Sequence, residues 1–292
     1  MRVVKIVYDG VVRTLELPAQ IVPRGYIIGK PLHVFIDGIE NAVINGIYPI
    51  DKPVALGSTG VIRVLEAPSA NEGLSGKVAF VSPVSYKGLL SVDLDGLLST
   101  YVVVPEEHII GVTNTVPRPL SALSCIASLS YRLALEAGPN PLIVGCGVSG
   151  LMTALHVLSD GGSPEIICVR RESLRYARSV GLVPIQSLEN LKEEYSSVVY
   201  TSNAPWMLRS LLRRGISKLV VSPLINRVSI MLMHSIRRVE VIMPMPSRIE
   251  YKREVVEKIR RLLGFVELNN IVDVFGLVPP PKPGVIISFT RS

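Results

Sequence analysis

The stretch PLIVGCGVSG, residues 141–150, decides the fold of this chain. Its first four residues are apolar, or proline, and are typical of the start of a buried strand. The pattern G-x-G-x-x-G follows, with glycines at 145, 147 and 150. Leucines and an alanine between residues 151 and 158 then recur at helical spacing. A strand, a glycine-rich turn and a helix in this order predict a site for the pyrophosphate of a dinucleotide.

Each residue of the turn has an expected task. Gly145 permits the tight turn, Gly147 lets the backbone approach the pyrophosphate, and Gly150 lets the helix pack on the strand. Val148 and Ser149 open the helix, whose N–H groups and positive dipole favour a phosphate. The alternative is a glycine-rich turn in an α/β fold that binds nothing.

Two arginines follow the next strand, at the place where such sites usually carry an acid. The strand EIICV, residues 165–169, ends in Arg170 and Arg171. An Asp or Glu about 20 residues after the loop normally holds the ribose hydroxyls, and Arg170 stands 20 positions after Gly150 (170 − 150 = 20). These arginines, with Arg175 nearby, favour the 2′-phosphate of NADP(H) over NAD(H). The alternative is a solvated basic start to a helix.

Composition limits the class of protein. The chain has 292 residues, enough for two domains, and it is 48% hydrophobic and 19% charged. These values indicate a well-packed protein and exclude a disordered one. The net charge of +7 suits an anionic cofactor or substrate. The basic residues are not accompanied by a regular series of aromatic residues or by a recognition-helix motif, so we do not expect nucleic-acid binding.

The chain carries no pattern typical of a membrane protein. Its longest apolar stretch, Ile216–Ile236, is interrupted by charged residues and a proline and is not expected to span a membrane. The N-terminus lacks the layout of a signal peptide, which favours a cytoplasmic protein. Few Gln and Cys residues, with many Pro and Val, point to a thermophile.

The three cysteines, Cys125, Cys146 and Cys168, are an odd number without metal-like spacing. We therefore expect neither a disulfide framework nor a structural zinc finger. On this reasoning Cys146 is a small hydrophobic residue within the loop, and Cys125 belongs to an apolar helix.

The predicted secondary-structure pattern changes near residue 117. Residues 1–115 contain short strands separated by Gly and Pro, beginning with a hairpin around Asp9-Gly10, and predict an antiparallel, barrel-like domain. From about residue 118 helices and strands alternate, which predicts a parallel sheet. Final strands are expected at residues 271–277 and 285–289, where the tail rejoins the first domain. The expected domains are 1–117, completed by 245–292, and 118–244.

These features together resemble the medium-chain dehydrogenase/reductase family, the alcohol dehydrogenase-like enzymes. The segment DGLLSTYVVVP, residues 95–105, is similar to a strand that closes the family's first domain. The segment SCIASLSY, residues 124–131, resembles the start of its inter-domain helix, and residues 142–150 resemble its cofactor loop. The resemblance implies an α/β chain: a GroES-like β-barrel substrate domain, a doubly wound Rossmann domain with a parallel sheet, and frequent homodimers.

The departures from the family concern its catalytic zinc. The positions of the three ligands correspond to Glu40, to Ser58 with Thr59 beside it, and to Cys125, so that only Cys125 keeps its type. A catalytic zinc needs three good N, S or O ligands. No cysteine lies between residues 1 and 124 to build the family's structural zinc lobe. The chain therefore resembles a short, zinc-free member.

The expected function is an NADP(H)-dependent, zinc-independent oxidoreductase that transfers hydride to or from a small carbonyl compound or activated alkene. Glu40 is a candidate proton donor or relay, Ser58 a candidate hydrogen-bond donor to substrate, and Cys125 a candidate nucleophile. Each has a structural alternative. Glu40 could be a solvent-facing carboxylate, Ser58 a turn residue and Cys125 a core residue. The rival function is a non-catalytic nucleotide-binding protein that kept the fold, and a zinc enzyme using Cys125 and Glu40 is a third.

Overall fold

A computed structural model describes residues 2–18, 21–68, 72–225, 239–281 and 283–290. The chain forms two compact units. The first contains residues 1–126, 246–249 and 263–292, and the second contains residues 127–245 and 250–262. The boundary thus lies at residue 126, where the sequence predicted 117, and residues 250–262 of the tail belong to the second unit.

The first unit is built from short, mainly antiparallel strands. Its largest sheet has the order β10-β6-β5-β3-β18-β17, with β9 also paired to β3. A second sheet has the order β2-β1-β4, and β7 pairs with β8. The strands are β1 (Arg2–Tyr8), β2 (Val12–Pro18), β3 (Tyr26–Ile36), β4 (Val54–Ala55), β5 (Thr59–Glu66), β6 (Val78–Val81), β7 (Val84–Ser85), β8 (Gly88–Leu89), β9 (Val102–Pro105), β10 (Ile109–Thr113), β17 (Gly264–Leu268) and β18 (Val285–Phe289).

Turn chemistry explains how the first strands pair. β1 and β2 form the predicted hairpin, in which Tyr8 pairs with Val12 and Gly10 takes a φ of +104°. Only glycine adopts that conformation readily. The unit's one α-helix among the described residues is α1 (Gly38–Ile44), and its 3₁₀ turns are η1 (Glu72–Leu74), η2 (Glu106–His108), η3 (Pro119–Leu123) and η6 (Ile271–Leu277).

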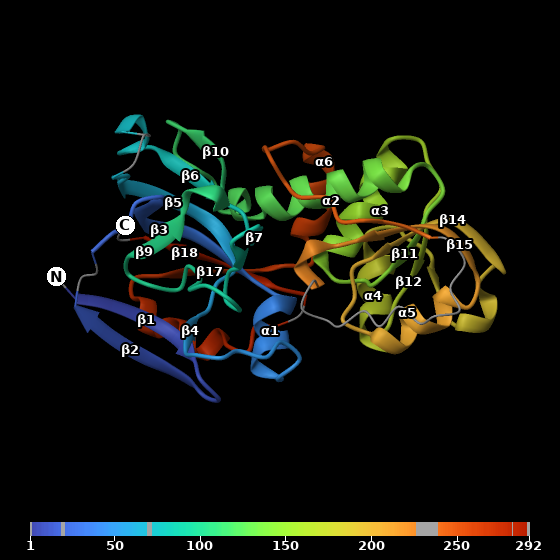
Figure 1. Cartoon of the computed structure of the whole chain (residues 1–292), viewed down its shortest axis with the longest axis horizontal. Helices are drawn as coiled ribbons and strands as arrows, with labels where there is room; N and C mark the ends of the chain where they lie inside the picture. The colour runs from blue at the N-terminus through green and yellow to red at the C-terminus, as the bar shows by residue number, and fades with distance from the viewer. Residues whose placement is uncertain (1, 19–20, 69–71, 226–238, 282, 291–292) are drawn as a thin grey trace. The chain divides into compact units, whose positions relative to one another are not determined.

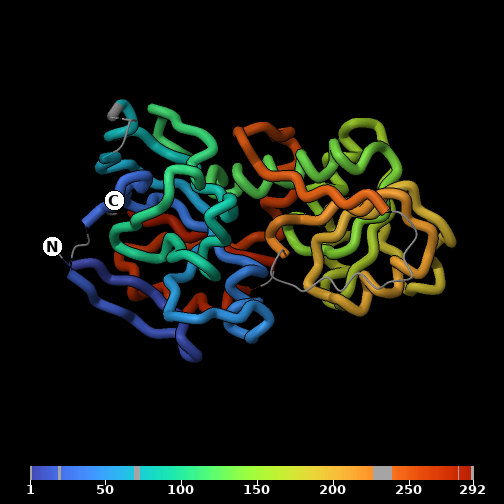
Figure 2. The backbone as a smooth tube through the Cα atoms, in the orientation of Figure 1, coloured from blue at the N-terminus to red at the C-terminus, as the bar shows by residue number. Residues whose placement is uncertain are grey.

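The tail returns to the first unit as an interior strand of its largest sheet. β18 runs antiparallel to β3, with Ile287 opposite Val34, and parallel to β17 on its other side. Figure 2 shows this red segment among the blue strands of the N-terminal half. The strand predicted at 285–289 is therefore confirmed. The strand predicted at 271–277 is wrong, because Asn270 caps a 3₁₀ turn there by accepting a hydrogen bond from the Val272 N–H.

The second unit has one parallel sheet with the order β13-β12-β11-β14-β15-β16. Figure 1 shows β11, β12, β14 and β15 side by side. Sequential strands move outward from β11 in one direction and then from β14 in the other, which makes the gap between β11 and β14 the topological switch point. The strands are β11 (Leu142–Val144), β12 (Glu165–Ile167), β13 (Pro184–Ile185), β14 (Glu194–Tyr200), β15 (Gly215–Val221) and β16 (Glu240–Ile242).

Helices connect these strands and cover the sheet. They are α3 (Val148–Ser159), α4 (Arg171–Ser179), α5 (Pro205–Leu212) and α6 (Arg253–Arg260), with 3₁₀ turns η4 (Leu188–Asn190) and η5 (Pro223–Ile225); α2 (Ser124–Ala137) begins just before the boundary. The apolar side chains of β11, β14 and α5 form one core cluster that includes Val144, Tyr200 and Leu208. Alternating strands and helices with a buried sheet are what the sequence predicted.

No helix in the described part of the chain is long and apolar enough to cross a membrane. Part of the apolar stretch Ile216–Ile236 lies in β15 and η5, while its residues 226–236 lie outside the described residues.

The tail strand should contribute to the stability of the first unit. Ile287 is fully buried in β18. We expect Ile287→Ala to lower the free energy of unfolding by about 2–5 kcal/mol, because it removes apolar contacts and leaves a cavity. The matched control is Val272→Ala in η6, where the side chain is 41% exposed. This substitution should change the free energy of unfolding by less than about 0.5 kcal/mol. Urea unfolding measures both, and equal losses would contradict a core role for the tail.

Candidate functional site

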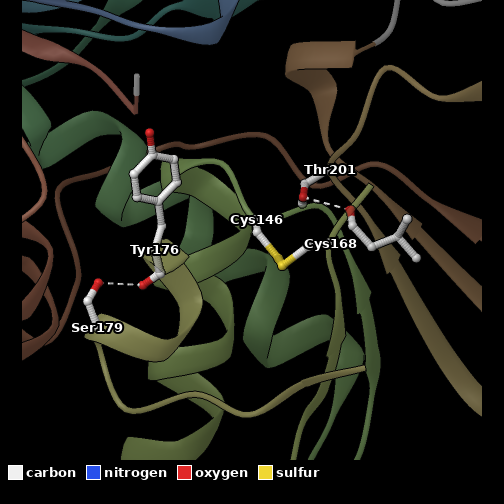
Figure 3. The surroundings of a disulfide bond; sticks show 6 residues. Cys146, Cys168, Tyr176, Ser179 and Thr201 are labelled. Carbon is white, nitrogen blue, oxygen red and sulfur yellow. Dashed lines mark hydrogen bonds between the residues drawn. A yellow bond between two sulfur atoms is a disulfide. The ribbon is translucent and has the colours of Figure 1, made fainter. Parts of the chain in front are cut away.

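The glycine-rich loop begins at the carboxyl end of β11, beside the switch point. Val144, the last residue of β11, pairs with Ile167 of β12 and with Tyr200 of β14. Its carbonyl accepts hydrogen bonds from both the backbone N–H and the hydroxyl of Thr201, at 3.0 and 2.9 Å. The Gly145 N–H donates to the Ile167 carbonyl at 3.0 Å. The start of the loop is therefore held by both neighbouring strands. Figure 3 draws the bond from the Thr201 hydroxyl.

Two glycines of the loop are required by the protein itself. Gly145 has a φ of +116°, and a Cβ there would lie 2.7 Å from the Thr201 hydroxyl. A Cβ on Gly150 would lie only 2.0 Å from the Gly145 carbonyl oxygen. These contacts explain the tight turn and the close approach of the helix to the strand that the sequence predicted.

Gly147 differs, because nothing in the protein requires a glycine there. It is exposed, its φ of −75° suits any residue, and a Cβ added to it would meet no atom within 4 Å. It is the N-cap of α3, and the first hydrogen bond of that helix runs from the Leu151 N–H to the Gly147 carbonyl. The N–H groups of residues 148–150 precede this bond and have no acceptor within the helix.

These features make the start of α3 suitable for a pyrophosphate. Val148 is buried and Ser149 is half-buried, so that their side chains do not cover the helix end from the solvent side. The Ser149 carbonyl accepts hydrogen bonds from the hydroxyls of Ser130 and Thr153, at 3.2 and 2.8 Å. A bare Gly147 beside unpaired N–H groups and the positive end of a 12-residue helix is a favourable place for an anion.

A disulfide joins Cys146 to Cys168, and this corrects the sequence-based expectation. The Cα atoms lie 5.1 Å apart across 22 positions of sequence. Cys146 is therefore not the small hydrophobic residue that the sequence predicted, and the argument against a disulfide framework overlooked this single bond. The odd count misled because Cys125 alone stays free. Two cysteines that each follow an adjacent parallel strand were the signal, and closing a loop of this length stabilises the fold by about 3 kcal/mol.

The candidate arginines lie just beyond this disulfide. Arg170 is the N-cap residue of α4 and Arg171 its first residue, and both are exposed. Arg175, one turn later, is also exposed, and its guanidinium lies 5.9 Å from the centre of the Tyr176 ring. The three arginines thus lie at the first turns of one helix, near the carboxyl edge of the sheet.

In the first unit, Glu40 is a buried cross-link. Its side chain is fully buried in α1. One carboxylate oxygen accepts the Asp37 N–H at 2.8 Å, which completes a capping box at the start of the helix. The other accepts the Ser58 N–H at 2.7 Å and the Ser91 hydroxyl at 3.4 Å. Glu40 therefore fastens α1 to the turn that contains Ser58, and it is not the solvent-facing carboxylate that the sequence left open.

Cys125 lies next to this turn but is chemically inert. The thiol is buried, and burial raises its pKa well above the usual range, with the hydrogen-bonding Thr59 beside it acting weakly in the opposite direction. Without a bound cation a thiol in that state is protonated near neutral pH, which lowers its reactivity as a nucleophile. The structure thus brings the family's three ligand positions into one neighbourhood of the first unit. Among the described residues, no group of three or more His, Cys, Asp or Glu could hold a metal ion.

Sequence reasoning missed Asp37, the titrating group of this neighbourhood. Asp37 caps α1 by accepting the Ile39 N–H at 3.0 Å. Burial raises its pKa from 3.8 to about 7, and the neighbouring Glu40 carboxylate acts in the same direction. A helix N-cap is usually exposed, so nothing in the sequence indicated that this carboxyl would remain protonated close to neutral pH.

Comparisons with known proteins agree with this architecture. A dehydrogenase from Sinorhizobium meliloti, named as zinc-binding and bound to NADP, superimposes with a TM-score of 0.67 at 15% identity, covering 99% of each chain. Acetophenone reductase from Geotrichum candidum, in complex with NAD, gives a TM-score of 0.72 at 13% identity, covering 98% of this chain and 97% of that chain. The fold is that of the medium-chain alcohol dehydrogenases.

That fold confirms the predicted GroES-like and Rossmann domains. The sequence similarity is more local. A zinc-type alcohol dehydrogenase-like protein from Haemophilus influenzae is 29% identical over 98 residues, which are 32% of this chain and 29% of that protein. No protein-family model matches the chain. The activity and substrates of the similar proteins are therefore not carried over to this chain by similarity alone.

The three glycines predict different effects of alanine. Gly150→Ala should lower the free energy of unfolding by about 1–3 kcal/mol or more, because the new Cβ overlaps the Gly145 carbonyl. Gly147→Ala should change it by less than about 1 kcal/mol, because the backbone there already suits alanine and the poorer N-cap offsets the gain in rigidity. Urea unfolding tests the pair, and a large loss with Gly147→Ala would contradict the open space at that position.

Asp37 predicts a pH-dependent difference in stability. Its pKa is higher in the folded chain than in the unfolded chain, so its contribution to the free energy of unfolding falls as the pH rises from about 4 to about 7. Asp37→Asn keeps a capping side chain without the titration. Relative to the wild type, the variant should gain stability across that range, by up to about 1.4 kcal/mol per pH unit. Urea unfolding at several pH values measures the difference, and parallel profiles would contradict it.

Proposed function

We propose that this chain is an NADP(H)-dependent oxidoreductase that transfers hydride to or from a small carbonyl compound or activated alkene without zinc. The observation that carries the proposal is Gly147, a glycine that the fold does not need, exposed beside the unpaired N–H groups of α3. An absent side chain at that point is what a pyrophosphate requires. The chain is proposed to act on a small molecule and to form a homodimer, as the fold family implies.

The residues fit a dinucleotide at the switch point of the sheet. Gly145, Gly147 and the N–H groups of Val148, Ser149 and Gly150 would hold the pyrophosphate. In such sites the ribose lies near the end of the second strand, which is where Arg170 and Arg171 stand. Arginine cannot accept a hydrogen bond from a ribose hydroxyl, but it donates to a 2′-phosphate. This donor set is the support for NADP(H) over NAD(H), and Arg175 adds a third positive charge.

The nicotinamide supplies or accepts the hydride when the cofactor is bound. The chain's own residues would bind and orient the partners, which can lower the barrier by several kcal/mol. The proposal assigns Glu40 a positioning role, since both of its oxygens already accept hydrogen bonds from α1 and from the Ser58 turn. Ser58 remains the candidate donor to a substrate oxygen. Cys125 is left without a catalytic role, because its pKa keeps the thiol protonated.

Zinc independence rests on the donor set. Of the three residues at the ligand positions, only Cys125 is a typical zinc ligand, and both carboxylate oxygens of Glu40 already accept backbone N–H groups. Ser58 offers a hydroxyl, which is a poor zinc ligand. A chemistry that needs no Lewis acid suits an acceptor that is already activated, such as an enone, quinone or iminium.

Affinity measurements separate the parts of this proposal. NADPH should bind more tightly than NADH in calorimetry or nicotinamide fluorescence. Arg170→Ala and Arg171→Ala should each weaken NADPH about tenfold or more while leaving NADH nearly unchanged, because each removes a charge-assisted hydrogen bond. Gly147→Ala should weaken both nucleotides. Arg178→Ala, an exposed arginine later on the same helix, is the matched control. Equal affinity for the two nucleotides would refute the arginine argument.

A second candidate function is a nucleotide-binding protein without catalysis. The state of the candidate catalytic side chains favours it. Glu40 already accepts hydrogen bonds within the first unit, and burial keeps the thiol of Cys125 protonated. Oxidation of NADPH with a panel of enones, quinones and aldehydes decides between the two. Nucleotide binding without turnover on any of these acceptors would favour the second candidate.

A further inference from the structure

The disulfide lies between the two parts of the proposed cofactor site. Cys146 stands between the first two glycines of the loop, and Cys168 is the first residue after β12. Figure 3 shows the bond crossing from the loop after β11 to the chain after β12. Two extended residues span at most about 7 Å, so the backbone of Arg170 lies close to the cross-linked Cys168.

The disulfide connects the segments after β11 and β12 beyond the point where their backbones are hydrogen-bonded to each other. Among the described residues, the last backbone hydrogen bond between the two segments is the one from the Gly145 N–H to the Ile167 carbonyl. Cys146 and Cys168 are the next residues in each segment. Beyond that hydrogen bond, the disulfide is the covalent tie between the phosphate loop and the chain that leads into α4, and the side chain of Val169 adds packing against the core of the sheet.

Few side chains of α4 are fully buried. Ala177 is the one buried side chain among the nine residues of this helix, and it lies near the C-terminal end. Residues 171–176 are exposed or half-buried. The position of Arg170 and Arg171 relative to the phosphate loop therefore depends on what restrains the chain just before them.

We propose that Cys146 and Cys168 are positioning residues that set the preference for NADP(H), an inference that rests on the proposed function. Their disulfide holds the arginine-bearing segment at a fixed distance from the phosphate loop. A nucleotide with a 2′-phosphate uses both parts of the site and gains from this preorganisation, whereas NADH relies chiefly on the loop. The loop itself keeps its hydrogen bonds to β12 and β14 when the disulfide is opened.

A dithiol reductant opens the disulfide in a balanced two-electron exchange. The Cys146–Cys168 bond breaks, each sulfur gains a proton from the reductant's thiols, and the reductant closes to its own disulfide. Cys146 is 3% exposed and Cys168 is half-buried, so attack is expected on the sulfur of Cys168. A thiol count on the unfolded chain should rise from one to three, because Cys125 is the third cysteine and is buried in the folded chain.

The experiment measures the dissociation constants of NADPH and NADH for the full chain, oxidised and reduced with dithiothreitol. The affinity for NADPH should fall about five- to tenfold on reduction, while that for NADH changes less than about twofold, and reoxidation should restore the original ratio. The Cys146→Ala/Cys168→Ala variant should behave like the reduced chain and ignore the reductant. Ile259→Ala, a buried position in α6, controls for lost stability and should keep the ratio.

Three results would overturn the positioning role: a ratio that reduction leaves unchanged, equal losses for both nucleotides, or tighter NADPH binding after reduction. An oxidised chain that binds both nucleotides equally well would refute the arginine argument and the positioning role with it. An oxidised chain that binds neither nucleotide would refute the proposed function itself, so the failure of each idea has its own signature.

Discussion

The candidate site depends on the parallel pairing of β11 with β12 and β14. Val144 lies opposite Ile167 on one side and Tyr200 on the other, so three strands end at one level. Thr201 closes this edge by donating two hydrogen bonds to the Val144 carbonyl. Because the loop, the disulfide and the arginines all follow directly from these strand ends, a shift of register by one residue would separate them.

The first unit contains a buried carboxylate that holds separate segments together. A carboxylate withdrawn from water is costly unless each oxygen is hydrogen-bonded. Glu40 meets this requirement with two backbone N–H groups and the Ser91 hydroxyl, and Ser91 itself adopts a φ of +68°. The carboxylate thus joins a helix start, a turn and a strained loop residue, which is a structural task that a metal ion performs in other proteins.

The sequence predicted the elements whose signals are local. The glycine loop, the hairpin at Gly10 and the alternation of strands and helices follow from backbone conformations and hydrophobic spacing, and the structure has them. Contacts between distant segments were harder to predict from the sequence. The Cys146–Cys168 bond required knowing that β11 and β12 are neighbours in register. The raised pKa of Asp37 required knowing that its carboxyl is withdrawn from water and that Glu40 lies beside it. The 3₁₀ turn at 271–277 has apolar residues that match a strand equally well, and only the Asn270 cap distinguishes the two.

The disulfide also restricts the conformational freedom of the glycine-rich loop. Three glycines in six residues give the loop more conformational freedom than other sequences have, and ordering them costs correspondingly more. The fold recovers order at the two ends of the loop, through Thr201 at Gly145 and through the start of α3 at Gly150. Cys146 adds a covalent restraint between these two ends. Gly147 can then stay bare for a ligand while the backbone around it is fixed, and this combination makes a flexible sequence into a preorganised site.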